Sequence, residues 1–159
     1  MSDLTHLDDQ GHARMVDVGD KPPTRRRAIA RATLVVGERV MEAIEAGETP
    51  KGNVYETARI AGILGAKRTS DLIPLCHPLP LDHVEVDFTP APDRIEIEAS
   101  AATRSPTGVE MEALTACAVA GLTLYDMLKA LSKEMRLENL HLVAKSGGRS
   151  GDYRAPDAG

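Results

Sequence analysis

The stretch KSGGRSGDY, residues 145–153, places two cations and three glycines close together near the end of the chain. Glycine readily adopts positive φ, so successive backbone N–H groups of such a loop can turn toward one point and surround an anion. Lys145 and Arg149 would add two positive charges to those N–H groups. The stretch therefore predicts an anion-binding loop, and a flexible terminus is the alternative that these residues alone leave open.

A second group of charged residues interrupts an apolar helical pattern. Asp126 and Lys129 stand three residues apart in LTLYDMLKALSKEM, so they lie side by side on a helix. The pair is either a solvated ion pair or an acid and a base, and the second role requires burial that lowers the lysine pKa. Glu112 shares a helix face with Asp126, but the fourteen residues between these positions span about 21 Å. A site shared between subunits would resolve that distance.

The segment SDLIPLCHPLPLDH carries Cys76 and His77 among prolines that disfavour helix and hold the chain extended. A cysteine beside a base can be a nucleophile, but adjacent residues rarely face each other and a lone cysteine is usually buried. We therefore favour a structural Cys76, whereas His77 can present a donor to a ligand. No CxxC, HExxH, EF-hand or P-loop pattern occurs, so the sequence predicts no metal site.

Hydrophobic periodicity predicts the elements that carry these residues. The expected order is a strand over 25–36, helices over 37–47 and 53–65, a hairpin over 82–104, a long helix over 105–135 and a strand over 138–145. Asn53 with Glu56, and Thr107 with Glu110, match helix-capping patterns. This order predicts an α+β two-layer sandwich, ferredoxin-like, with a mainly antiparallel sheet packed by helices. Residues 1–23 would form an extended arm, 24–153 a single catalytic domain and 154–159 a flexible tail.

Composition limits the classes of protein to consider. The chain has 159 residues and 42 % hydrophobic residues, which is enough for one domain with its own core. A formal net charge of −5 argues against nucleic-acid binding. Two cysteines are too few for a disulfide framework and fit a reducing compartment. No signal peptide or membrane-spanning run is recognisable, so we expect a cytoplasmic protein without nucleic-acid or membrane partners.

Four blocks of the chain resemble the cyclic pyranopterin monophosphate synthase family of molybdenum cofactor biosynthesis. The blocks are LTHLDDQGHARMVDVGDK, KGNVYETARIAGILGAKRTSDLIPLCHPL, SPTGVEMEALTACAVAGLTLYDM and AKSGGRSGD. They keep the order and approximate spacing of the family and extend over residues 4–153, nearly the whole chain.

The resemblance implies a lyase that converts (8S)-3′,8-cyclo-7,8-dihydroguanosine 5′-triphosphate into cyclic pyranopterin monophosphate and releases diphosphate. It implies no metal or redox cofactor. It also implies a homohexamer, a trimer of dimers, with active sites between subunits.

Matching positions imply roles for individual residues. The catalytic acid–base aspartate of the family corresponds to Asp126, and its two catalytic lysines to Lys129 and Lys145. The residues implied to bind substrate, or to lie near the site, are Leu75, Cys76, His77, Met111, Glu112, Lys51, Glu110 and Arg149. Arg149 stands where the family often has lysine, and its guanidinium keeps the positive charge.

Two other classes of protein stay open. A ferredoxin-like RNA-binding module would need aromatic side chains for base stacking, and only Phe88 is available. A non-catalytic nucleotide-binding sensor could use the glycine loop and Lys145, but it would not need Asp126 and Lys129 in an apolar helix.

Overall fold

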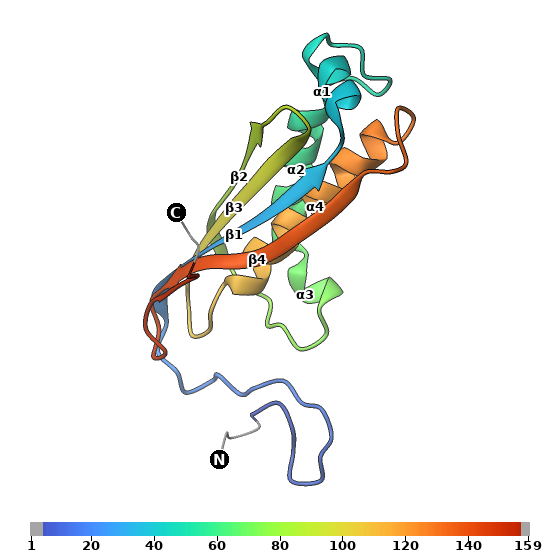
Figure 1. Cartoon of the computed structure of the whole chain (residues 1–159). Helices are drawn as coiled ribbons and strands as arrows, with labels where there is room; N and C mark the ends of the chain where they lie inside the picture. Colours follow the sequence, from blue (N-terminus) through green and yellow to red (C-terminus); the bar gives the residue numbers. More distant parts are fainter. Residues whose placement is uncertain (1–4, 157–159) are drawn as a thin grey trace.

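The computed structural model describes residues 5–156 and shows one sheet covered on one side by helices (Figure 1). Along the chain the elements are β1 (Thr24–Val35), α1 (Glu38–Glu45), α2 (Val54–Lys67), α3 (Thr69–Leu72), β2 (Leu81–Pro90), β3 (Arg94–Ser105), α4 (Glu110–Leu128), β4 (Arg136–Ser146) and β5 (Tyr153–Arg154).

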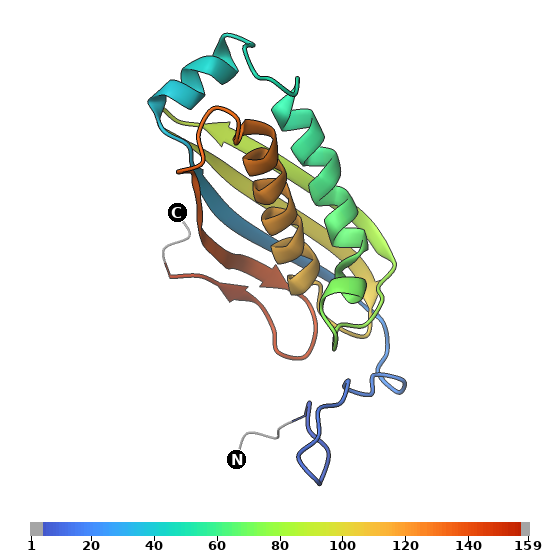
Figure 2. The ribbon, with the colours of Figure 1, turned by 90° about the vertical axis from the view of Figure 1, so that its right-hand side faces the viewer.

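The sheet has the strand order β2-β3-β1-β4-β5, and each neighbouring pair is antiparallel. Helices α2 and α4 lie next to each other across one face of this sheet (Figure 2). The split β-α-β units with a shared antiparallel sheet are the ferredoxin-like arrangement. The predicted α+β two-layer sandwich is therefore confirmed.

The core is built from small aliphatic side chains, as expected from a chain with few aromatic residues. On the helix-covered face, Ala28 and Ala30 of β1 pair with Ala101 and Ala99 of β3, and all four are buried. Alanine lets the helices approach the sheet closely, and α4 contributes several buried alanines of its own. Helix α4 is long and apolar enough to cross a membrane, but 56 % of its most apolar stretch is buried in the fold. It is the central core helix of the sandwich.

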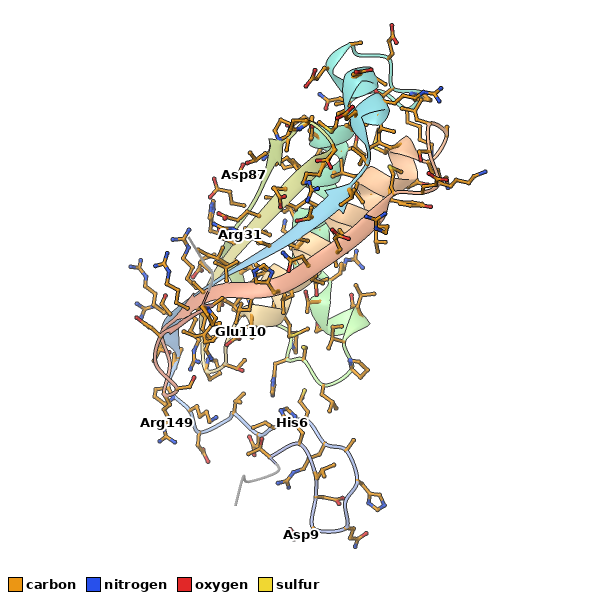
Figure 3. All side chains as sticks on the ribbon, in the orientation of Figure 1. His6, Asp9, Arg31, Asp87, Glu110 and Arg149 are labelled. Carbon is orange, nitrogen blue, oxygen red and sulfur yellow. The ribbon has the colours of Figure 1, made fainter. Side chains whose placement is uncertain are left out.

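The opposite face of the sheet is polar and open. Arg31 donates to Glu98 at 2.7 Å, and the Thr33 hydroxyl donates to Glu96 at 2.6 Å. Figure 3 shows Arg31 and Asp87 projecting from the sheet on the side away from α4. The alternation predicted for the hairpin, with one buried face and one charged face, is thus confirmed.

Two helix boundaries differ from the prediction. Asn53 caps α2 as expected, because its side chain accepts from the Glu56 N–H. The capping box predicted at Thr107 is wrong: α4 starts only at Glu110, its cap residue is Val109 without a side-chain cap, and the Thr107 carbonyl instead accepts from Ser105. Helix α4 also ends at Leu128 rather than residue 135, because the chain turns there toward β4.

The ends of the chain refine the expected boundaries. The arm before β1 holds a tight turn in which Asp8 accepts from the Gln10 and His12 N–H groups. At the other end, β5 includes Arg154, and the Ala155 N–H donates to Val143, so sheet pairing continues past residue 153. Residues 157–159 of the expected flexible tail lie outside the described residues.

Candidate functional site

The glycine loop after β4 has the backbone conformation that its sequence predicts. Gly147, Gly148 and Gly151 have φ values of 89°, 84° and 71°, in the region that favours glycine. The loop is also internally braced, because the Gly147 N–H donates to Asp152 Oδ1 at 3.2 Å. Lys145 precedes the loop as the second-to-last residue of β4, so its backbone is fixed in the sheet.

Lys145 lies between the glycine loop and the start of α4. Its Nζ is 2.9 Å from Glu110 Oε1 and 3.1 Å from Ser150 Oγ. We name Lys145, Glu110 and Ser150 the Lys145 cluster. About a quarter of the Lys145 and Glu110 side chains is exposed, so the ion pair is only partly shielded from water. Figure 3 shows Glu110 and Arg149 at the same end of the sheet.

A cavity of about 320 Å³ lies beside this cluster. One of its walls consists of residues predicted to bind substrate, and these are Leu75, Cys76, His77, Glu110, Met111 and Glu112. The other wall comes from the arm and includes Val16, Val18 and Lys21. His77 connects the walls, because its Nε2 lies 2.7 Å from the Val16 carbonyl oxygen and donates to it when that nitrogen is protonated. The arm was expected only as an extended segment, and its share in the cavity was missed.

Glu112 is the most buried charged residue of the cavity, with 4 % of its surface exposed. Burial raises the pKa of its carboxyl to about 7, a hydrogen bond from its own backbone N–H lowers it, and the charge of Glu110 raises it further. Burial and then the charge of Glu112 raise the pKa of the Cys76 thiol. Glu112 can thus hold or release a proton near neutral pH, whereas a Cys76 thiolate is disfavoured.

A second cluster lies at the other end of α4. Asp126 accepts hydrogen bonds from Lys129 at 2.8 Å and from Lys51 at 2.9 Å, and we name these three residues the Asp126 cluster. The hydrogen bonds from Lys129 and then Lys51 lower the pKa of Asp126 to about 2. Lys51 belongs to the connection between α1 and α2, so long-range folding brings it to the acid.

The Asp126 cluster is exposed, which in the single chain matches the solvated ion pair, one of the two alternatives that the sequence left open. Its apolar sequence surroundings suggested burial, but about half of the Asp126 and Lys129 side chains is accessible to solvent. Leu124 and Leu128 point to the core from another side of the helix, because neighbours in sequence face different directions, whereas Leu122, one turn before Asp126, is exposed like the acid. Asp126 raises the pKa of Lys129 by hydrogen bonding and charge, so in the single chain this lysine is a poor base.

The two clusters lie far apart within one chain. Glu110 begins α4 and Asp126 stands in its last turn, sixteen residues later, so the helical rise separates them by about 24 Å. Figure 1 shows the start and the end of α4 at opposite ends of the sandwich. The cavity, glycine loop and Lys145 thus form one half of the candidate site, and the acid with its two lysines forms the other.

Fold and site together define a ferredoxin-like protein whose acid, lysines and anion loop are divided between the two ends of one helix. The model of the MoaC family matches residues 15–148, and this chain belongs to that family. The chain is 57 % identical to the cyclic pyranopterin monophosphate synthase of Nostoc sp., over 98 % of this chain and 94 % of that protein. The protein of that name from Novosphingobium aromaticivorans is 57 % identical, over 99 % and 100 %. The one from Chloroflexus aurantiacus is 54 % identical, over 98 % and 96 %.

Proposed function

We propose that this chain is a lyase of molybdenum cofactor biosynthesis that makes cyclic pyranopterin monophosphate. Its substrate is (8S)-3′,8-cyclo-7,8-dihydroguanosine 5′-triphosphate, and diphosphate is released. The observation that carries the proposal is the cavity wall, where six residues chosen from the sequence line one space beside Lys145. Family membership and relatives at 54–57 % identity over nearly the full length support the same activity.

The half-site around Lys145 suits the triphosphate. A polyphosphate brings several negative charges, and the Lys145 ammonium with the loop N–H groups supplies donors for them. Arg149 adds a guanidinium to the same loop, and Arg is well suited to phosphate because its donors form a planar fork. In the free chain the Lys145 ammonium is paired with the Glu110 carboxylate. A substrate phosphate that binds Lys145 therefore displaces this carboxylate rather than water.

The half-site around Asp126 suits proton transfer. Opening and closing the ring system needs groups that accept and donate protons. Asp126 is ionised at neutral pH and serves as the acceptor, and the protonated Lys129 beside it serves as a donor. Contact with another subunit would remove water from both groups and bring their pKa values closer together.

A complete site then consists of the Lys145 half of one subunit and the Asp126 half of another. The separation of about 24 Å along α4 supports this arrangement, since one small substrate does not bridge it. A closed homo-oligomer supplies such contacts repeatedly, and a homohexamer built as a trimer of dimers satisfies the requirement. We assign the enzyme to the cytoplasm, acting on a small-molecule substrate.

The direct test is turnover of the cyclised triphosphate by the purified chain, followed as diphosphate release. Diphosphate and the pyranopterin product should form in equal amounts. Tight binding without release of diphosphate would contradict the lyase and favour a nucleotide sensor.

Subunit mixing tests the shared site. Lys129→Ala and His77→Ala chains, each inactive alone, are dissociated and reassembled together. Random assembly should form one site in four from two intact halves, so about a quarter of wild-type activity returns. Lys129→Ala mixed with Asp126→Ala is the matched control, because both changes damage the same half and no recovery is expected. Equal recovery of activity in both mixtures would contradict a site divided between subunits. No recovery in either mixture, although mixed oligomers have formed, would contradict it as well.

A further inference from the structure

We propose that Arg26 is a positioning residue, which holds the glycine loop and the start of α4 in a fixed relation so that Lys145 can act. The inference rests on the proposed function. It concerns a residue on β1 that belongs to neither cluster and lines neither wall of the cavity beside Glu112.

The first contact of Arg26 is with the connection that leads into α4. Its Nε donates to the Ser105 carbonyl and its Nη2 to the Pro106 carbonyl, both at 3.3 Å. Arg26 is half-buried and pairs in register with Thr103 on the helix-covered face of the sheet. The guanidinium therefore fixes the backbone four residues before Glu110 through two donors of one rigid group.

The second contact of Arg26 is with the glycine loop. A Cβ added to Gly148 would collide with the Arg26 guanidinium, chiefly with Nη1. A Cβ on Gly147 would likewise collide with the carbonyl oxygen of Arg25. The glycine loop thus packs closely against the first residues of β1, and the absence of a Cβ at the two glycines allows that close approach.

Arg26 and Lys145 connect the same two segments in different ways. Lys145 reaches Glu110 at the start of α4 and Ser150 in the loop, and a phosphate would compete for these contacts. Arg26 instead donates to the Ser105 and Pro106 carbonyls from a half-buried position, and neither bond involves a member of the Lys145 cluster. When substrate phosphate binds Lys145 in place of Glu110 and Ser150, the contacts of Arg26 remain and hold the loop next to the start of α4. The functional role of Arg26 is therefore to preserve the geometry of the half-site while its ion pair opens.

Lysine is a poor replacement for this role. Its ammonium is a point charge on a flexible stem, whereas the planar guanidinium presents donors in fixed directions to two carbonyls and a flat surface to Gly148. Arg26→Lys therefore keeps the positive charge but removes the donors that are held in fixed directions. Arg104→Lys is the matched control, since Arg104 is an exposed arginine of β3 on the open face of the sheet.

The test combines kinetics with amide hydrogen exchange on the full chain. We expect Arg26→Lys to lower kcat/KM about tenfold or more, with part of the loss in kcat, because the reacting groups lose alignment. Amides of residues 146–151 should exchange faster in Arg26→Lys and Arg26→Gln without ligand. Arg104→Lys should match the wild type in both measurements.

Two results would overturn the inference. One is an Arg26→Lys enzyme with wild-type kcat and KM, which would show that a positive charge suffices. The other is unchanged exchange over residues 146–151 in both Arg26 variants. The exchange measurement needs no substrate, so it decides on Arg26 even if the wild-type chain fails to release diphosphate, a failure that would count against the proposed function instead.

Discussion

The buried carboxyl of Glu112 should make the stability of this protein depend on pH. Folding raises its pKa from 4.5 to about 7, because burial disfavours the charged form. Between these values the folded chain keeps a proton that the unfolded chain has released, so the free energy of unfolding falls as the pH rises. The contribution of Glu112 is complete below about pH 4.5 and is lost as the pH passes about 7. A pKa difference of about 2.5 corresponds to about 3 kcal/mol.

The substitution Glu112→Gln isolates this contribution. Glutamine has the shape of the protonated glutamate and carries no charge at any pH. The variant should therefore not lose this stability as the pH rises. Near pH 5 the free energies of unfolding of the two proteins should differ little. Near pH 8 the free energy of unfolding of the variant should exceed that of the wild type by up to about 3 kcal/mol. Urea unfolding at one fixed protein concentration measures this, since oligomer assembly makes stability depend on concentration.

A surface variant controls for the change in net charge. Glu48→Gln removes one negative charge from an exposed position of the same acidic chain. A Glu112→Gln variant whose free energy of unfolding differs from that of the wild type by the same amount at both pH values would contradict a raised pKa of Glu112. The same pH-dependent gain in Glu48→Gln would also contradict it, because it would show an effect of net charge alone.

Four further substitutions address the two half-sites and the core. Asp126→Asn should lower turnover by about a hundredfold or more, because the proton acceptor is lost; a folded variant with near wild-type activity would remove Asp126 from catalysis. Lys145→Arg should lower kcat strongly, because the compact ammonium is replaced by a bulkier group, whereas Arg149→Lys should be nearly silent in steady-state kinetics. An active Lys145→Arg enzyme would mean that charge alone suffices. Gly65→Ala would place a Cβ 2.8 Å from Val119 Cγ2, so urea unfolding should show a loss of about 1 kcal/mol despite the helix propensity of alanine; a stabilised variant would contradict this packing.

Most of the fold could be predicted because local patterns and long-range packing agree. The alternation in the β2–β3 hairpin and the Asn53 cap are signals that act within a few residues. The end of α4 could not be predicted in this way. Residues after Leu128 continue an apolar pattern, yet they belong to a turn, where the Tyr125 hydroxyl donates to the Lys133 carbonyl. Tertiary packing decided that boundary, and the sequence pattern carries no sign of it.

The strand that delivers Lys145 shows why the site itself is harder to predict than its elements. Strict alternation would put His141 and Lys145 on one face of β4. One of the two register shifts along the β1–β4 pair lies between these residues, at Ile29/Ala30, so His141 lies opposite Arg31 on the open face and Lys145 opposite Ala28 on the helix-covered face. Such bulges redirect side chains without a sequence signature of their own. The contact between Lys145 and Glu110 therefore follows from the structure alone.

The Asp126 cluster has a charge balance that a bound phosphate would change. In the chain alone, hydrogen bonds from Lys129 and Lys51 lower the pKa of Asp126 to about 2, so its carboxylate is a weak base. A polyphosphate carries more negative charge than one carboxylate and competes for the same two ammonium groups. A lysine that turns to phosphate no longer lowers the pKa of Asp126, which then rises and makes the carboxylate a stronger base. If Asp126 is the proton acceptor proposed above, we therefore expect its basicity to rise only when the anionic substrate is bound.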